Sequence, residues 1–105
     1  TRKNGTDEYG IMRALKKNKL KSESFDLPFI GAEYNLKSNI KNGNPVIIYF
    51  EDLEHWCTVI GMLGNKFIIF DSYEYEINGV KLLSSKELKK YWENDNKCYG
   101  IVVSK

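Results

Sequence analysis

Three apolar runs separated by short connections constrain the fold more than any other part of the chain. Residues 46–50 (VIIYF) are apolar throughout, which is typical of a central strand that is covered on both faces. Residues 55–63 and 66–72 are also strand-like, and Gly64 and Asn65 between them supply turn chemistry. Because consecutive strands with tight connections pair antiparallel, we expect an antiparallel sheet built around these residues.

The segments on either side of this region carry helix and strand patterns. Ser84, followed three residues later by Glu87, has the sequence of a capping box, and the helix that it would start carries Leu88, Tyr91 and Trp92 on one face. The predicted elements are, in order, a helix over 7–18, a short edge strand over 20–26, a short helix over 32–41, the three strands above, two strand pieces over 73–83, the capped helix and a final strand over 98–103. We expect one α+β domain over residues 1–105, an antiparallel β-sheet with flanking helices.

The composition is that of an ordinary globular domain, with 42% hydrophobic and 29% charged residues and a net charge of +2. The apolar runs end at about six residues, which is too short for a transmembrane helix. Lys16, Lys17, Lys19 and Lys21 lie where the first helix should end, and they complement its dipole there. Because no aromatic residues are interleaved with them, we expect no nucleic-acid partner. Two cysteines do not form a zinc site, and we expect no metal and no cofactor.

The single histidine of the chain, His55, opens the second strand, and Asp71 ends the third. In an extended strand, side chains alternate between the two faces. One face of the second strand would then carry His55, Cys57, Val59 and Gly61, and the other would carry Trp56, Thr58, Ile60 and Met62.

The register between these two strands decides whether His55 and Asp71 can meet. A two-residue loop pairs Leu63 with Lys66 and leaves Asp71 on the face opposite His55. A three-residue loop pairs Met62 with Lys66 instead, and Asp71 then lies across from Cys57 and diagonal to His55, within hydrogen-bond reach. The functional interpretation therefore requires the longer loop or a β-bulge.

A carboxylate that accepts the Nδ1 proton of a histidine fixes its tautomer and leaves Nε2 to act as general base and then general acid. His55 and Asp71 are therefore candidate catalytic residues. The structural alternative is a partly exposed histidine at a strand start and a carboxylate that begins a turn. Trp56 is a candidate for substrate binding, with packing in the core or at its rim as the alternative.

Several segments together resemble the C-terminal part of papain-like cysteine peptidases. These segments are GNPVIIYF, HWCTVIG and KFIIFDS, followed by a Ser-capped helix and the closing CYGIVV. The closest type is the double-glycine leader peptidase of bacteriocin-exporting transporters and its stand-alone relatives. The residues that match that family are Gly43, Pro45, Val46, Ile47, His55 and Asp71. The family often has Asp-Pro where this chain has Asp71 followed by Ser72.

The resemblance implies a nucleophilic cysteine at the start of a helix, and residues 1–54 contain no cysteine. We therefore expect that cysteine, and the helical segment that carries it, upstream of Thr1. Cys57 lies on the face of His55, but same-face neighbours on a strand are about 6.5–7 Å apart. We expect both Cys57 and Cys98 to be buried, unreactive thiols, and the sequence leaves a disulfide between them open.

The resemblance implies a domain that cleaves peptides. Two alternatives stand beside it: an inactive peptidase-like domain that binds a peptide or transporter substrate, and a papain-like acyltransferase or amide hydrolase. The expected partners are a peptide or protein substrate and a transporter or an upstream segment of the same protein, without membrane insertion. A transporter-associated protein would be cytoplasmic, and a stand-alone one would be extracellular or at the cell surface.

Overall fold

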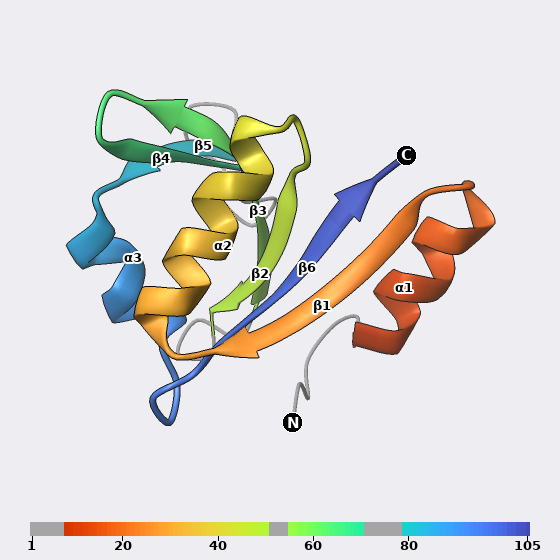
Figure 1. The fold of residues 1–105 in the computed structure, drawn as a ribbon, viewed down its shortest axis with the longest axis horizontal. Helices are drawn as coiled ribbons and strands as arrows, with labels where there is room; N and C mark the ends of the chain where they lie inside the picture. Colours follow the sequence, from red (N-terminus) through yellow and green to blue (C-terminus); the bar gives the residue numbers. More distant parts are fainter. Residues whose placement is uncertain (1–7, 51–54, 71–78) are drawn as a thin grey trace.

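The computed structural model describes residues 8–50, 55–70 and 79–105. In chain order these ranges contain the elements α1 (Glu8–Lys17), β1 (Lys21–Leu27), α2 (Phe29–Lys41), β2 (Val46–Phe50), β3 (His55–Leu63), β4 (Lys66–Phe70), β5 (Val80–Leu83), α3 (Ser85–Trp92) and β6 (Cys98–Ser104). The α+β class expected from the sequence is therefore confirmed (Figure 1).

The strands form a six-stranded sheet in the order β1-β6-β2-β3-β4-β5, and each pair is antiparallel. Strand β6 lies between β1 and β2, so that Phe25 pairs with Gly100 on one side and Ile48 pairs with Gly100 on the other. Strand β2 is central, as its apolar run predicts, and β1 is an edge strand. The edge positions of the sheet belong to β1, which has seven residues, and to β5, which has four.

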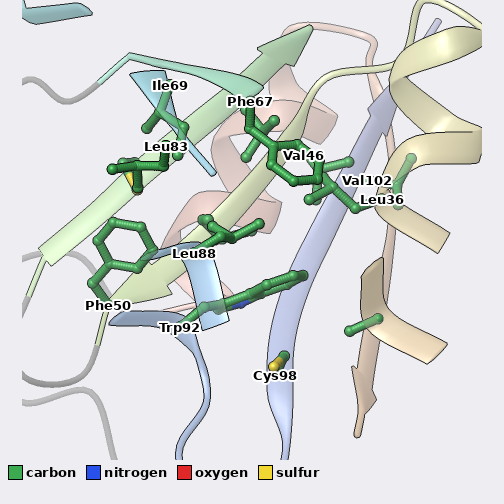
Figure 2. Packing of buried hydrophobic residues seen from close by; sticks show 14 residues of the cluster. Leu36, Val46, Phe50, Phe67, Ile69, Leu83, Leu88, Trp92, Cys98 and Val102 are labelled. Atoms are coloured by element: carbon green, nitrogen blue, oxygen red, sulfur yellow. The ribbon is translucent and has the colours of Figure 1, made fainter. Parts of the chain in front are cut away.

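Helices α2 and α3 pack on the same face of the sheet and cover one hydrophobic core. Figure 2 shows side chains from both helices meeting those from the strands, with Leu88 and Trp92 of α3 between Phe50 and Cys98. The fully buried members include Leu36, Val46, Ile48, Val59, Phe67, Ile69, Leu88 and Cys98. Burying each large aliphatic or aromatic side chain of this kind stabilises the fold by about 1.5–3 kcal/mol before the entropy of ordering is subtracted.

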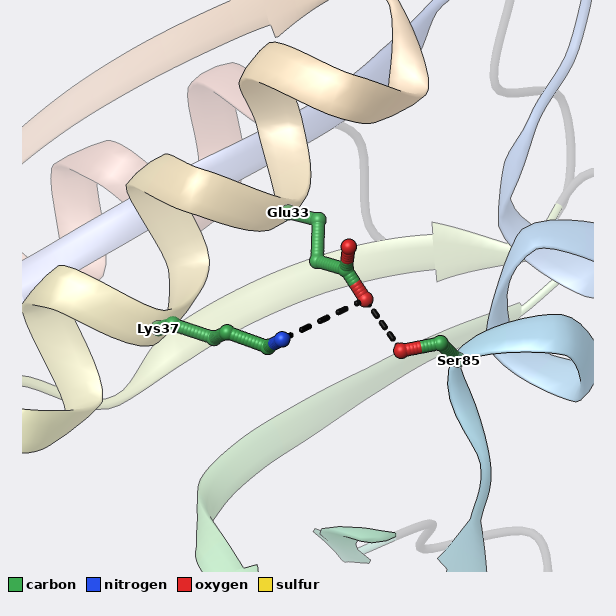
Figure 3. Close-up of polar contacts among 3 residues, drawn as sticks. All are labelled: Glu33, Lys37 and Ser85. Atoms are coloured by element: carbon green, nitrogen blue, oxygen red, sulfur yellow. Dashed lines mark hydrogen bonds and ion pairs between the residues drawn. The ribbon is translucent and has the colours of Figure 1, made fainter. Parts of the chain in front are cut away.

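A polar contact joins the two helices above this core (Figure 3). The Ser85 hydroxyl at the start of α3 donates a hydrogen bond to the Glu33 carboxylate on α2. The Lys37 ammonium lies 3.8 Å from the same carboxylate oxygen, one helical turn further along α2. Since the two helices come from distant parts of the chain, this contact fixes one against the other.

Helix α1 lies apart from that core. It packs against β1, and in Figure 2 its pale red ribbon is behind the sheet, on the side away from the labelled core residues. Its last turn ends in two hydrogen bonds, from Lys19 N–H to Lys16 O (3.0 Å) and from Leu20 N–H to Leu15 O (2.9 Å), with Lys19 in the left-handed conformation at φ 62°. This is a Schellman motif, and it turns the chain back into β1.

Two helix boundaries test the sequence interpretation. Helix α2 starts at Phe29, three residues before the predicted start, because Pro28 acts as its N-cap and not as a break: the Pro28 carbonyl accepts a hydrogen bond from Ala32 N–H (2.9 Å). The capping box of α3 is confirmed, since Ser84 Oγ accepts from Glu87 N–H (3.2 Å) and Glu87 Oε1 accepts from Ser84 N–H (2.9 Å). Hydrogen bonding of the Glu87 carboxyl to Ser84, first to its backbone N–H and then to its side chain, lowers the pKa of Glu87 below its usual value.

Candidate functional site

The backbone of His55 lies at the first position of β3, where it pairs with Phe50, the last residue of β2. The neighbouring pairs alternate in environment. Ile48 and Cys57 belong to the core under the helices, whereas Tyr49 and Trp56 lie on the other face of the sheet. The start of β3 at His55 is the boundary that the sequence predicts.

The turn between β3 and β4 has two residues, since Leu63 pairs with Lys66, and Gly64 adopts a positive φ of 62°. Of the two loops that the sequence leaves open, the turn therefore has the two-residue one. A β-bulge between Val59 and Gly61 follows instead, and it shifts the register by one residue. Beyond it, Val59 pairs with Ile69 and Thr58 pairs with Phe70. These are the pairs that the three-residue loop would have produced.

The bulge also corrects the predicted faces of β3. Met62 packs against the core together with Val59, although strict alternation puts it on the opposite face. The extra residue, Ile60, is 51% exposed. Side chains alternate regularly between the two faces of the sheet before Ile60 and again after it. A β-bulge has no strong sequence signature here, because no glycine marks the residue that is left unpaired.

Asp71 and the side chain of His55 lie outside the described residues. The register of the last described pair, Thr58 with Phe70, is the register that a three-residue loop would give. The sequence leaves two registers open for β3 and β4. At this end of β3, the described pairs have the register that the functional interpretation requires.

Both cysteines are buried thiols, with Cys57 3% and Cys98 0% exposed, and no disulfide joins them. Burial in the core, together with the smaller effect of the Glu93 and Asp26 carboxylates, raises the pKa of Cys98 to about 12. A thiol with so high a pKa carries almost no thiolate near neutral pH, and the thiolate is the nucleophilic form. The expectation of buried thiols is confirmed for both residues.

Trp56 lies in an aromatic cluster on the sheet face away from α2 and α3. Its ring centroid is 4.9 Å from that of Tyr49 and 6.2 Å from that of Tyr99, and both pairs have edge-to-face geometry. Trp56 remains partly exposed, whereas Tyr49 is buried. Packing against these two tyrosines is enough to explain the position of the Trp56 side chain.

A cavity of about 180 Å³ adjoins this cluster. It is lined by Asp26, Tyr49, Trp92, Asn94, Asp95, Lys97 and Tyr99. Trp92 Nε1 donates a hydrogen bond to the Tyr99 carbonyl (2.8 Å), which holds the base of the cavity together. Because Tyr49 directly precedes Phe50, the cavity is one strand position from the backbone of His55. The sequence does not predict this cavity, since its lining residues come from three separate segments of the chain.

The described residues offer no group of three or more His, Cys, Asp or Glu side chains that could hold a metal ion. Over the same residues, none of the helices is long and apolar enough to span a membrane. Comparison with known proteins yields no further relationship: no family model, no curated protein and no solved structure matches this chain.

Proposed function

We propose that this chain is the acid–base part of a papain-like cysteine peptidase domain. His55 is the general acid and base, Asp71 orients it, and the nucleophile is a cysteine N-terminal to Thr1 in the same protein. The supporting features are the antiparallel sheet with helices packed on it, the β3 start at His55 and the resemblance of the sequence around both residues.

The observation that carries the proposal is the β-bulge at Ile60. A regular hairpin with the two-residue turn at Gly64 would give the register in which the histidine and the aspartate belong to opposite faces. The bulge shifts Thr58 into register with Phe70, and the proposal takes Asp71 to follow in the same register. Bulges are common where a sheet has to aim a functional side chain, which supports this interpretation.

In the proposed reaction, His55 Nε2 takes the proton of the cysteine thiol, and the resulting thiolate attacks the scissile carbonyl carbon of the peptide. The C–N bond then breaks, and the imidazolium gives its proton to the leaving amine. Water, deprotonated by His55, hydrolyses the thioester and restores the thiol. Asp71 accepts the Nδ1 hydrogen bond throughout and stabilises the imidazolium. An acyltransferase or amide hydrolase would use the same three groups with another acceptor or substrate.

The burial of both cysteines favours a second candidate, a peptide-binding domain that does not cleave. Cys57 and Cys98 are both buried, so the described part of the chain supplies no exposed thiol as a nucleophile. In that case, the partly exposed Trp56 and the adjacent cavity would contact the peptide, and the partner would be a peptide or transporter substrate.

The two candidates are separated by a cleavage assay on the protein with the residues that precede Thr1 included. A peptide library is digested by the wild type, His55→Ala, Asp71→Asn and a surface control, Glu23→Gln, which removes one charge from an exposed position on β1. We expect the rate to fall by at least about 1,000-fold in His55→Ala and by a comparable factor in Asp71→Asn, with Glu23→Gln unchanged.

Cleavage that survives in His55→Ala would refute the peptidase proposal. If no variant and no wild type cleaves, peptide binding is measured by the fluorescence of the wild type and of Trp56→Phe. A saturable fluorescence change that is lost in Trp56→Phe would support the binding domain, and no change in either protein would refute it.

A further inference from the structure

The C-terminal turn of α1 and the start of β1 enclose an open hollow of about 560 Å³. We call it the basic hollow; it is lined by Met12, Arg13, Lys16, Leu20, Lys21 and Ser22. The Schellman turn at Lys19 creates it, because the reversal brings Lys21 back beside the last turns of the helix. Residues from a helix and from an edge strand therefore present their cations around one depression.

Positive charge is concentrated around the basic hollow. Residues 13–21 contain five of the sixteen basic residues of the chain and no acidic residue, so the rest of the chain has eleven basic against fourteen acidic side chains. Arg13, Lys16, Lys17, Lys19 and Lys21 are all exposed. The helix dipole favours cations only in the last turn of α1. It therefore does not account for five exposed cations over residues 13–21.

The residues that line the basic hollow indicate which chemical class of partner it can bind. Among the lining residues, Met12 and Leu20 are half-buried apolar side chains, whereas Arg13, Lys16 and Lys21 are exposed. Nucleic acid is disfavoured because none of the described lining residues is aromatic and able to stack on a base. The five cations and the lack of acidic residues over 13–21 favour an anionic partner instead.

We propose that the basic hollow docks this domain onto a membrane surface that contains anionic phospholipids. Lysine and arginine side chains bind headgroup phosphates and carboxylates without a fixed geometry, and clusters of four to eight of them are enough for such surfaces. Met12 and Leu20 add a small apolar surface between these cations, which can contact the apolar parts of the membrane interface. The domain lies on the bilayer and does not enter it. This inference stands independently of the peptidase proposal.

The test is co-sedimentation with phosphatidylcholine vesicles that contain about 30% phosphatidylserine. The variant replaces Arg13, Lys16 and Lys21 with Gln, and the matched control replaces Lys41, Lys86 and Lys89, which are exposed elsewhere, with Gln. Both triple variants lose the same net charge. At about fivefold per cation, we expect the partition coefficient to fall about 100-fold in the first and less than about threefold in the control.

The wild type should also be released at about 0.5 M salt and should ignore pure phosphatidylcholine vesicles. Far-UV circular dichroism checks that each variant is folded, and the three single substitutions replace the triple variant if it is not. The proposal is overturned if the wild type does not bind the anionic vesicles, if both triple variants weaken equally, or if a poly-glutamate peptide or an RNA oligomer displaces the vesicles at equal charge concentration.

Discussion

Thr58 of β3 pairs with Phe70 of β4, although the two-residue turn that joins the strands would by itself set a register one residue different. The bulge at Ile60 accounts for the difference. The same bulge keeps Val59 and Met62 together on the core face, so packing of the hydrophobic core and register at the start of β3 are determined by one extra residue.

Deleting Ile60 should therefore be tolerated. With it removed, Val59 and Gly61 become neighbours opposite Ile69 and Ile68, and every described pair is kept. We expect a loss of less than about 1 kcal/mol in the free energy of unfolding, because the deleted side chain is mostly exposed. Deleting Thr58 is the control, since it moves Cys57 and Trp56 to the opposite faces and should prevent folding. Urea melts measure both, and a Thr58 deletion no worse than that of Ile60 would contradict the register argument.

Gly100 should not accept a side chain. A Cβ at this position would lie 2.5 Å from Phe25 Cζ and 2.8 Å from Cε2, and the Phe25 ring is itself packed edge-to-face on Trp92 at 6.0 Å. We expect Gly100→Ala to cost about 2 kcal/mol, as overpacked cores do. Phe25→Leu should relieve part of that cost, so a double-mutant cycle should give a coupling of at least about 0.5 kcal/mol. Additive effects would show that the close approach to Phe25 is not the cause.

The contact between Ser85 and Glu33 should stabilise the packing of α3 against α2. We expect Ser85→Ala and Glu33→Met each to cost about 1 kcal/mol, with a coupling energy near that value because each removes the same hydrogen bond. Lys37→Met is the comparison: its ion pair is 3.8 Å long, and its side chain is 48% exposed, so the loss should be under about 0.5 kcal/mol. Thermal melts of the four proteins give the cycle, and a coupling near zero would contradict this role.

The raised pKa of Cys98 predicts a stability that falls in alkali. The folded protein keeps the thiol protonated up to a pKa of about 12, whereas the unfolded chain releases the proton near 9, so the contribution is complete below about pH 9 and is lost as pH rises toward 12. The stability difference between wild type and Cys98→Ala should shrink by up to about 1.4 kcal/mol per pH unit over that range. A difference that stays constant from pH 8 to about 11 would contradict a buried, protonated thiol. At pH 8, a thiol reagent should label neither cysteine until denaturant is added.

Local patterns in the sequence predict most of the elements, because each pattern reports a local preference. The alternation in 55–63, the apolar run 46–50 and the Ser84 capping box give strands and a helix start where the structure has them. The sequence does not predict that β6 pairs with β1, since two seven-residue strands far apart in the chain carry no signal of their partnership.

The candidate site likewise has one feature that the sequence predicts and another that it does not. The position of His55 at a strand start follows from the pattern of the strand, whereas the register that relates it to the next strand depends on the bulge at Ile60, a tertiary feature. The cavity beside Tyr49 was missed because its lining residues are polar or aromatic side chains of ordinary turns and strand ends, brought together by the pairing of β1, β6 and β2.

The place of β6 between β1 and β2 has a consequence for synthesis of the protein. Strand β1 is made early, but its sheet partner, Cys98–Ser104, is made some seventy residues later, at about 5–20 residues per second. For several seconds the nascent chain holds an unpaired β1 and a β2 with one open edge. The order of translation therefore delays closure of the sheet, and β2 to β5 with their covering helices must stay soluble on their own until it occurs.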